Sequence, residues 1–216
     1  MSRFLAPIHT LLFNKIKVTE DLEINLINSF KEVYGEKVTV IVNDINKKYG
    51  NPLEDAPLED LIDTDNIHGW LQNKIAAAET RQAELLGYLI NKFGEQAEKV
   101  AFNVYNNQAN NLAKQSKNIY ETTTAPDIYQ ALNVYILEGM PCDNVNSITI
   151  KDVDILEWQN IKCLHRAYWE IAGANVDTLY SLRFSWFKTF VQTINPQFTY
   201  TVKKEGSTII HRIERK

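Results

Sequence analysis

The residues best suited to chemistry are Cys163 and His165, which a single residue separates in the sequence. On a β-strand, side chains two positions apart point to the same face, so this spacing would pair a thiol with an imidazole. A thiolate is both a nucleophile and a metal ligand, and a nearby histidine favours its formation. Cys163 and His165 are therefore candidate catalytic residues. The alternative is a buried free cysteine beside a hydrogen-bonded histidine, because free cysteine is among the most buried residue types.

Two further residues extend this pair to a candidate metal site. His211 alternates with Ile209 and Ile213, so it would face inward on a strand, and Cys142 lies in the loop that follows a predicted helix. Thiols and imidazoles are the ligands that a transition metal such as zinc prefers, although this spacing matches no recognised zinc motif. The candidate metal ligands are Cys142, Cys163, His165 and His211. A histidine satisfied by hydrogen bonds within the core is the alternative for His211.

Aromatic residues are frequent, with ten tyrosines, nine phenylalanines and four tryptophans, many of them in the second half of the chain. Most such rings form core, but rings gathered around a sheet also wall pockets for flat or apolar ligands. The candidate pocket residues are Tyr168, Trp169, Tyr200 and His211. We therefore expect a small-molecule ligand.

Composition and missing motifs exclude several classes of function. The formal net charge is −4 and no basic stripe is present, so neither a nucleic-acid nor a membrane partner is expected. No G-x-S-x-G elbow, glycine-rich phosphate loop or H-E-x-x-H motif occurs. The apolar N-terminal stretch is interrupted by Pro7, His9 and Asn14, which disfavours a signal peptide. Two cysteines make no disulfide framework, so we expect a cytoplasmic protein.

Apolar residues recur at helical spacing as far as Gly139, which predicts a series of helices. The predicted helices are one starting at Pro7, one from a Thr19 cap to Gly35, one over 38–49, one over 71–93, one over 95–112 and one from a Thr124 cap to Gly139. Residues 38–42 are rich in β-branched side chains, but helical spacing and the stop signal at Gly50 favour a helix. Residues 51–67 read as an acidic loop, and the asparagines at 106, 107, 110 and 111 predict an exposed helix end.

After Gly139 the period changes to that of strands. Ile148 and Ile150 alternate with polar residues, as do Val153 and Ile155. Ile161, Cys163 and His165 also lie two positions apart. Helices follow over 166–173 and 176–193, and the chain closes as a hairpin around Glu205-Gly206. This order predicts an α+β fold, with N-terminal helices packed with a small C-terminal antiparallel sheet and two covering helices. We expect a single domain over 1–216, mainly helical over 1–138 and sheet-containing over 139–216.

Three segments of the second half are similar to a known family. They are Gly94-Glu95-Gln96-Ala97-Glu98, the stretch with Cys163 that leads into a helix, and the ending Asn195-Pro196…Tyr200…Glu205-Gly206-Ser207-Thr208. They resemble the L-2-amino-thiazoline-4-carboxylic acid hydrolase-like proteins. That family usually has a cysteine shortly after the turn glycine, where this chain has Ile210 beside His211. The resemblance implies a ring-opening hydrolase ancestry with Cys163 at its centre.

These observations support three hypotheses. The first is a small-molecule- or metal-binding protein that uses a Cys/His pocket between helices and sheet. The second is a hydrolase acting on the C–N or C–S bonds of a small cyclic substrate, with Cys163 as nucleophile or metal ligand and His165 or His211 as general base. The third is an interaction protein whose helical half forms a homo-oligomer.

Overall fold

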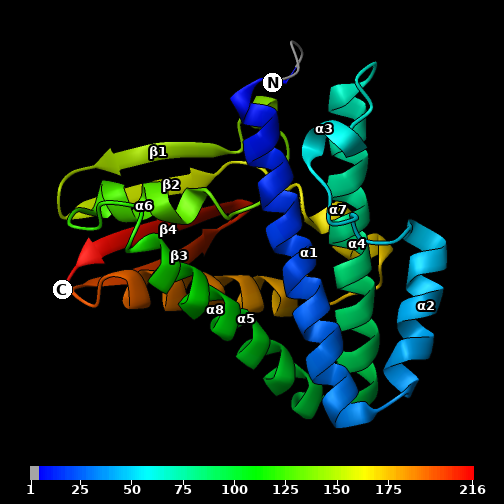
Figure 1. Cartoon of the computed structure of the whole chain (residues 1–216). Helices are drawn as coiled ribbons and strands as arrows, with labels where there is room; N and C mark the ends of the chain where they lie inside the picture. Colours follow the sequence, from blue (N-terminus) through cyan, green and yellow to red (C-terminus); the bar gives the residue numbers. More distant parts are fainter. Residues whose placement is uncertain (1–4) are drawn as a thin grey trace. The chain divides into compact units, whose positions relative to one another are not determined.

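A computed structural model describes residues 5–216 and shows an α+β protein with one four-stranded antiparallel sheet (Figure 1). Residues 1–4, part of the stretch for which no signal peptide is expected, lie outside the described residues. The chain divides into two compact units. The first contains the described residues up to Val100 together with His165–Val176, and the second contains Ala101–Leu164 and Asp177–Lys216.

The first unit is built from helices. They are α1 (Pro7–Tyr34), α2 (Lys37–Tyr49), α3 (Leu58–Leu61), α4 (Ile67–Phe93) and α7 (Arg166–Ile171). Helix α4 lies against α1, α2 and α7 and carries the buried residues Leu71, Ile75 and Leu89. The segment after α7 comes close to α4, because a Cβ added to Gly87 would lie 3.0 Å from the Cα of Ala174. Helix α4 is thus the central element of this unit.

Helix α1 is one continuous helix, so the predicted break before Thr19 was wrong. The Thr19 hydroxyl does not cap a new helix but donates to the carbonyl of Lys15, 3.0 Å away and one turn earlier. A threonine in a helix interior can bond in this way, so it is an ambiguous start signal. The helix over Lys37–Tyr49 and the stop at Gly50 are confirmed.

The second unit combines three α-helices and a short 3₁₀ helix with the sheet. Its elements are the part of α5 (Glu95–Ser116) from Ala101 onward, α6 (Ala125–Asn133), the short 3₁₀ helix η1 (Pro141–Asp143), β1 (Asn146–Lys151), β2 (Ile155–Asn160), α8 (Val176–Ile194, from Asp177 onward), β3 (Phe198–Glu205) and β4 (Thr208–Arg215). The strand order is β1-β2-β4-β3, and every neighbouring pair is antiparallel. The predicted Thr124 cap and the C-terminal hairpin are confirmed, whereas α6 ends at Asn133, before Gly139.

One face of the sheet is buried. Alternate residues of β2 and β4 are buried and face each other across the ladder, with Trp158 opposite His211 and Leu156 opposite Ile213. Helix α6 lies against β2 and β4, and Phe187 of α8 contacts Tyr200 of β3 edge-on at 5.6 Å. Figure 1 shows α8 running alongside the sheet. This inner face therefore positions the aromatic and polar side chains of the candidate functional site.

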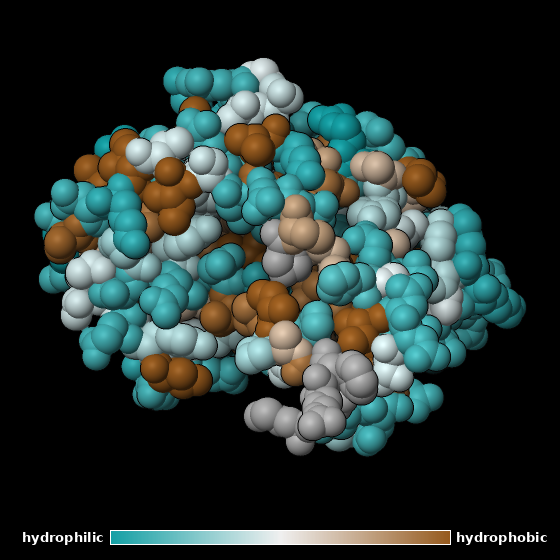
Figure 2. Space-filling model, turned by 90° about the horizontal axis from the view of Figure 1, so that it is seen from above, coloured by the Kyte–Doolittle hydropathy of each residue, from teal (hydrophilic) through white to brown (hydrophobic). Residues whose placement is uncertain are grey.

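The β1 edge of the sheet is more exposed. Ile148, Ile150 and Val153 are 47%, 39% and 58% exposed, and a β-bulge interrupts the pairing between Ile148 and Ile150. Figure 2 shows hydrophobic side chains at the surface on this part of the molecule. The core therefore depends mainly on β2, β4 and β3.

No strand runs through Ile161, Cys163 and His165, so that prediction was wrong. Strand β2 ends at Asn160, and the next five residues form a loop that leads into α7. None of the helices in residues 5–216 is long and apolar enough to cross a bilayer.

Candidate functional site

Cys163 lies in the loop after β2 and is half-buried in the second unit. The Tyr180 hydroxyl, from the beginning of α8, donates a hydrogen bond to its Sγ at 2.6 Å. The Tyr180 ring stacks on Phe184 one turn further along α8, with 5.4 Å between ring centroids. The thiol is thus held by a hydroxyl from the helix that covers the sheet.

His165 has different surroundings, because it belongs to the first unit. It precedes α7, and its Nδ1 lies 3.0 Å from a carboxylate oxygen of Glu79 on α4. Trp169 stacks on the imidazole at 5.1 Å and donates its indole N–H to the other Glu79 oxygen at 2.9 Å. The shared strand face that predicted a Cys163–His165 pair does not exist.

Tyr168 and Trp169 of the predicted pocket also belong to the first unit. The side-chain amide of Gln72 donates to the Tyr168 hydroxyl at 3.0 Å, so both aromatic residues connect α7 to α4. Tyr200 and His211 belong to the second unit. The four predicted pocket residues therefore fall into two pairs, each within its own unit.

His211 forms a hydrogen-bonded chain on the inner face of the sheet. Its side chain is 1% exposed, its Nδ1 lies 2.7 Å from the Tyr200 hydroxyl, and its Nε2 lies 2.5 Å from Oδ1 of Asn160. Asn160 in turn donates its amide to Oδ1 of Asn146. Because Asn160 offers an oxygen to the imidazole, Nε2 carries the proton and Nδ1 accepts from Tyr200. This chain fixes one neutral tautomer of His211.

Burial favours the same neutral form. It lowers the pKa of His211 to about 4, an effect that Glu138 opposes and Arg183 supports. Trp158 stacks flat on the imidazole, at 4.7 Å between ring centroids and 8° between planes. An imidazolium here would have to be charged inside an aromatic enclosure, so His211 is uncharged near neutral pH.

The thiol and the imidazole belong to one continuous group of side chains. Phe184 contacts both Tyr180 and the His211 ring, the latter at 5.8 Å. We refer to this group as the sheet cluster, which consists of Trp158, Asn160, Cys163, Tyr180, Phe184, Tyr200 and His211. It draws on β2, the loop after it, α8, β3 and β4.

One ion pair accompanies the sheet cluster. Arg183 of α8 forms an ion pair with Glu138, donates to the carbonyl of Leu137 at 3.1 Å and lies 5.0 Å from the centre of the Phe187 ring. The Glu138 carboxylate is close enough to raise the pKa of three tyrosines. Its charge therefore acts on Tyr180, Tyr200 and His211 of the cluster.

The tyrosines near this ion pair are held in their protonated form. Burial, and secondarily Glu138, raises the pKa of Tyr129 to about 12. The pKa of Tyr180 is raised by burial and by its bond to Cys163, and burial raises that of Tyr200 well above its ordinary value. Such displaced pKa values, gathered in one place, are typical of functional sites.

The predicted metal ligands do not come together as a set. Cys142 lies in η1 and is exposed, whereas Cys163, His165 and His211 have the separate partners described above. Within residues 5–216 no group of three or more His, Cys, Asp or Glu side chains is arranged to hold a metal ion. The geometry gives the four-residue zinc site no support.

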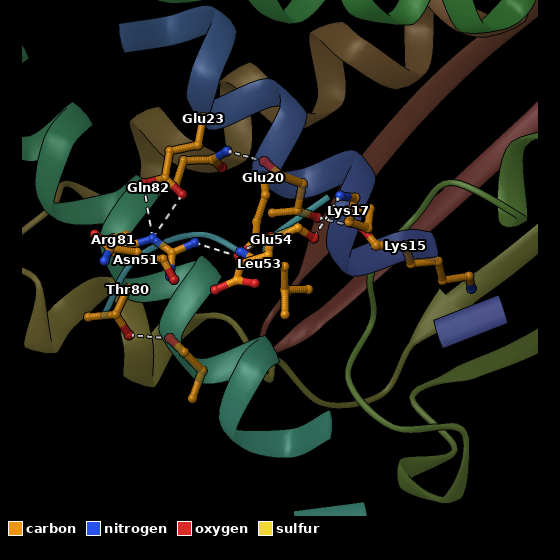
Figure 3. A network of polar contacts seen from close by, with 12 residues as sticks. Lys15, Lys17, Glu20, Glu23, Asn51, Leu53, Glu54, Thr80, Arg81 and Gln82 are labelled. Atoms are coloured by element: carbon orange, nitrogen blue, oxygen red, sulfur yellow. Dashed lines mark hydrogen bonds and ion pairs between the residues drawn. The ribbon is translucent and has the colours of Figure 1, made fainter. Parts of the chain in front are cut away.

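A second polar group lies in the core of the first unit (Figure 3). Arg81 of α4 is 1% exposed and donates from Nε to both carboxylate oxygens of Glu23 at 3.1 Å and from Nη2 to Glu20 at 2.6 Å. Glu20 also accepts the backbone N–H of Leu53 at 3.0 Å. The network joins α1, α4 and the loop after α2.

This network has a structural role. Burial raises the pKa of Glu23, and Arg81 opposes that shift. Burial would lower the pKa of Arg81, but the two carboxylates outweigh it and raise that pKa. The guanidinium is occupied by its partners on α1 and by the carbonyl of Asn51 at 3.5 Å. We therefore assign the network to stability rather than to binding.

Several of these residues were not predicted from the sequence. For some of them the sequence does contain a recognisable pattern. Glu20 and Glu23 lie four and seven positions after the buried Ile16, and Glu79 lies four after Ile75. A charged residue on an apolar stripe indicates a buried, paired group. No comparable signal connects Glu138 with Arg183, which are 45 positions apart.

The sequence matches no protein-family model, no curated protein and no solved structure.

Proposed function

We propose that this protein binds a small molecule at the sheet cluster. The supporting observation is the continuity of the cluster, in which a half-buried thiol, two tyrosine hydroxyls and a neutral imidazole lie among aromatic rings from the sheet and α8. Small-molecule sites combine apolar walls with a few convergent polar groups and displaced pKa values. Cys163, Tyr180, Tyr200 and His211 supply the polar contacts.

The competing explanation is a polar network that only stabilises the core. Ligand protection of the half-buried thiol distinguishes the two, because the chain has two cysteines and Cys142 is exposed. In a Cys142→Ser variant, an aromatic disulfide reagent reports on Cys163 alone. We expect fragments from a library of planar heterocycles to raise the melting temperature and to slow this reaction.

The matched control is Cys163→Ser, in which the same reagent reports on Cys142. The same fragments should leave that reaction unchanged, because Cys142 lies outside the sheet cluster. A library in which no fragment both stabilises the protein and protects Cys163 would contradict the proposal. Protection of Cys142 to the same degree would show a non-specific effect and would also contradict it.

A hydrolase is the second candidate. The Tyr180 hydroxyl at 2.6 Å from Sγ favours it, because such a donor stabilises negative charge on sulfur. The substrate class that the family resemblance implies is a small ring with C–N and C–S bonds. Incubation with 2-amino-thiazoline-4-carboxylic acid, followed by mass spectrometry, should show ring opening that Cys163→Ser abolishes. Equal turnover by the two proteins would exclude Cys163 as the nucleophile.

A further inference from the structure

We infer that Cys142 and Cys163 form a reversible disulfide when the protein reacts with a low-molecular-weight disulfide, and that the pair thereby acts as a redox switch. Both residues are thiols in the structure, and both belong to the second unit. The disulfide does not depend on the proposed function, although it removes the thiol that the sheet cluster would offer to a ligand.

The two cysteines lie on chain segments that run antiparallel beside each other. Beyond the last paired residues of β1 and β2, the N–H of Ile161 donates to the carbonyl of Val145 at 3.1 Å. Further from the strands, Lys162 forms an ion pair with Asp143 at 3.8 Å. The contacts therefore advance in opposite directions along the two segments, as they do in an antiparallel ladder.

A third contact completes the series on the far side of the cysteines. Gly139 lies so close to Leu164 that a Cβ added to the glycine would overlap Cδ1 of the leucine. The two cysteines stand between this contact and the ion pair, one on each segment. They are therefore facing positions in the alignment of the two segments.

Both thiols are accessible to a small reagent, because Cys142 is exposed and Cys163 is half-buried. A disulfide joins Cα atoms about 4.4–6.8 Å apart, a separation typical of facing positions in an antiparallel pair. Cys142 lies in η1, a turn of three residues, which can adjust without disturbing the paired strands. The Cys163 sulfur accepts the Tyr180 hydroxyl at 2.6 Å, so oxidation exchanges this hydrogen bond for a covalent bond.

The reaction is thiol–disulfide exchange in two steps. The exposed Cys142 thiolate attacks one sulfur of the small disulfide, which forms a mixed disulfide and releases one small thiolate. The Cys163 thiolate then attacks the Cys142 sulfur and releases the second small thiolate. In total the two protein thiols lose two protons and two electrons, and one small disulfide becomes two small thiols.

The disulfide has two structural consequences. It closes a ring of chain around the β1–β2 hairpin, because the two cysteines flank these strands in the sequence. It also takes the sulfur acceptor away from the Tyr180 hydroxyl. Reduction restores both features, so the state of the sheet cluster follows the redox poise of its surroundings.

Equilibration with reduced and oxidised glutathione tests the inference. The ratio of disulfide to dithiol protein, measured by mass spectrometry after alkylation, gives an equilibrium constant. We expect this constant to be at least about tenfold larger for the folded protein than in concentrated urea, because the fold holds the cysteines closer than a flexible chain does. Peptide mapping should show Cys142 joined to Cys163 within one molecule.

Matched variants make the test sharper. Cys142→Ser and Cys163→Ser each retain one thiol, so each should give only the mixed disulfide with glutathione. Asp143→Ala removes the carboxylate that joins the two segments, so it should lower the folded-state constant several-fold. Asp152→Ala is the control, because Asp152 lies between β1 and β2 at the other end of the hairpin, and it should leave that constant unchanged.

The outcomes decide the inference separately from the proposed function. An equilibrium constant that is no larger for the folded protein than in urea would overturn the inference, because the fold would then hold the cysteines apart. Disulfide-linked dimers in place of the internal bond would overturn it as well. Ligand protection is measured on the Cys142→Ser variant, which cannot form the internal disulfide, so either proposal can fail without the other.

Discussion

His211 illustrates how a single buried residue sets the electrostatic character of the sheet cluster. Tyr200 and Asn160 satisfy both ring nitrogens, and Trp158 covers one face of the imidazole. An imidazole in this position is a hydrogen-bonding group of fixed polarity rather than a proton carrier at neutral pH. Protonation would remove the acceptor that Tyr200 uses and would place a second donor in front of its hydroxyl.

This arrangement predicts a pH dependence of stability. The unfolded histidine has a pKa near 6.5, whereas in the folded protein it is about 4. Between these values the unfolded chain binds a proton that the folded chain does not, so the stability from this residue is present above the unfolded pKa and is lost as pH falls. The loss approaches roughly 3 kcal/mol.

The measurement is urea unfolding of wild type and His211→Gln between pH 7 and pH 4. The wild type should lose its advantage in free energy of unfolding as the pH falls, because glutamine does not titrate. Tyr200→Phe retains the imidazole, so its difference from wild type should change much less with pH. A difference between wild type and His211→Gln that is constant across this range would contradict the account.

At the scale of elements, buried polar groups determine which helices lie together. Arg81→Met would leave Glu20 and Glu23 buried without their counter-charge, so we expect a loss of about 3–5 kcal/mol in the free energy of unfolding. The exposed pair of Lys47 and Asp44 provides the control, because Lys47→Ala should cost less than about 1 kcal/mol. Adding Glu20→Gln and Glu23→Gln to Arg81→Met should recover part of the loss. Equal costs for Arg81→Met and Lys47→Ala would show that the network contributes little.

The asparagines of α5 give a second test at this scale. Oδ1 of Asn106 accepts from Ser185 at 2.8 Å and from Thr189 at 3.0 Å, both on α8. Asn106→Ala should cost about 1–3 kcal/mol, because two part-buried hydroxyls lose their acceptor. Asn107→Ala is the matched control, since Asn107 is exposed, and it should stay within about 0.5 kcal/mol of wild type. Equal effects in chemical denaturation would contradict this assignment.

These asparagines also show what the sequence could and could not reveal. Low apolar content predicted an exposed helix end, and Asn107 and Asn111 are exposed, but Asn106 and Asn110 bond to α8. Polar contacts between two helices do not follow the spacing of apolar residues. The periodicity of hydrophobic residues therefore does not detect them. The C-terminal hairpin was predictable because its alternation and its Gly206 turn agree.

The candidate site was only partly predictable for the same reason. His211 lies on a strand with clear alternation, so its inward position follows from the sequence. Cys163 lies in a loop, where no period constrains the direction of a side chain, and its partner Tyr180 is fixed by tertiary structure. Because Cys163 and His165 are not on a strand, the shared face that a strand would give them is absent.

At the scale of the whole molecule, the chain passes between its two compact units three times. Helix α5 begins in the first and continues in the second, and His165–Val176 completes the first between two segments of the second. Neither unit is a continuous stretch of sequence. We therefore expect a single cooperative unfolding transition, in keeping with the single domain predicted from the sequence.

Hydrogen exchange in increasing urea tests this cooperativity. Amides of α4 report on the first unit and amides of β4 on the second. Both sets should become exposed with the same midpoint and the same denaturant dependence. Separate midpoints would show that the two units unfold independently.

Side-chain NMR shows whether a small molecule binds at the sheet cluster, as we propose. The chain has four tryptophans, of which Trp158 lies in the cluster and Trp70 and Trp169 lie in the first unit. Titration with benzamide should shift the indole signal of Trp158 and the imidazole signals of His211, and should leave those of Trp70 and Trp169 in place. Shifts confined to the first unit, or no saturable shift at Trp158 with any planar fragment, would contradict the account.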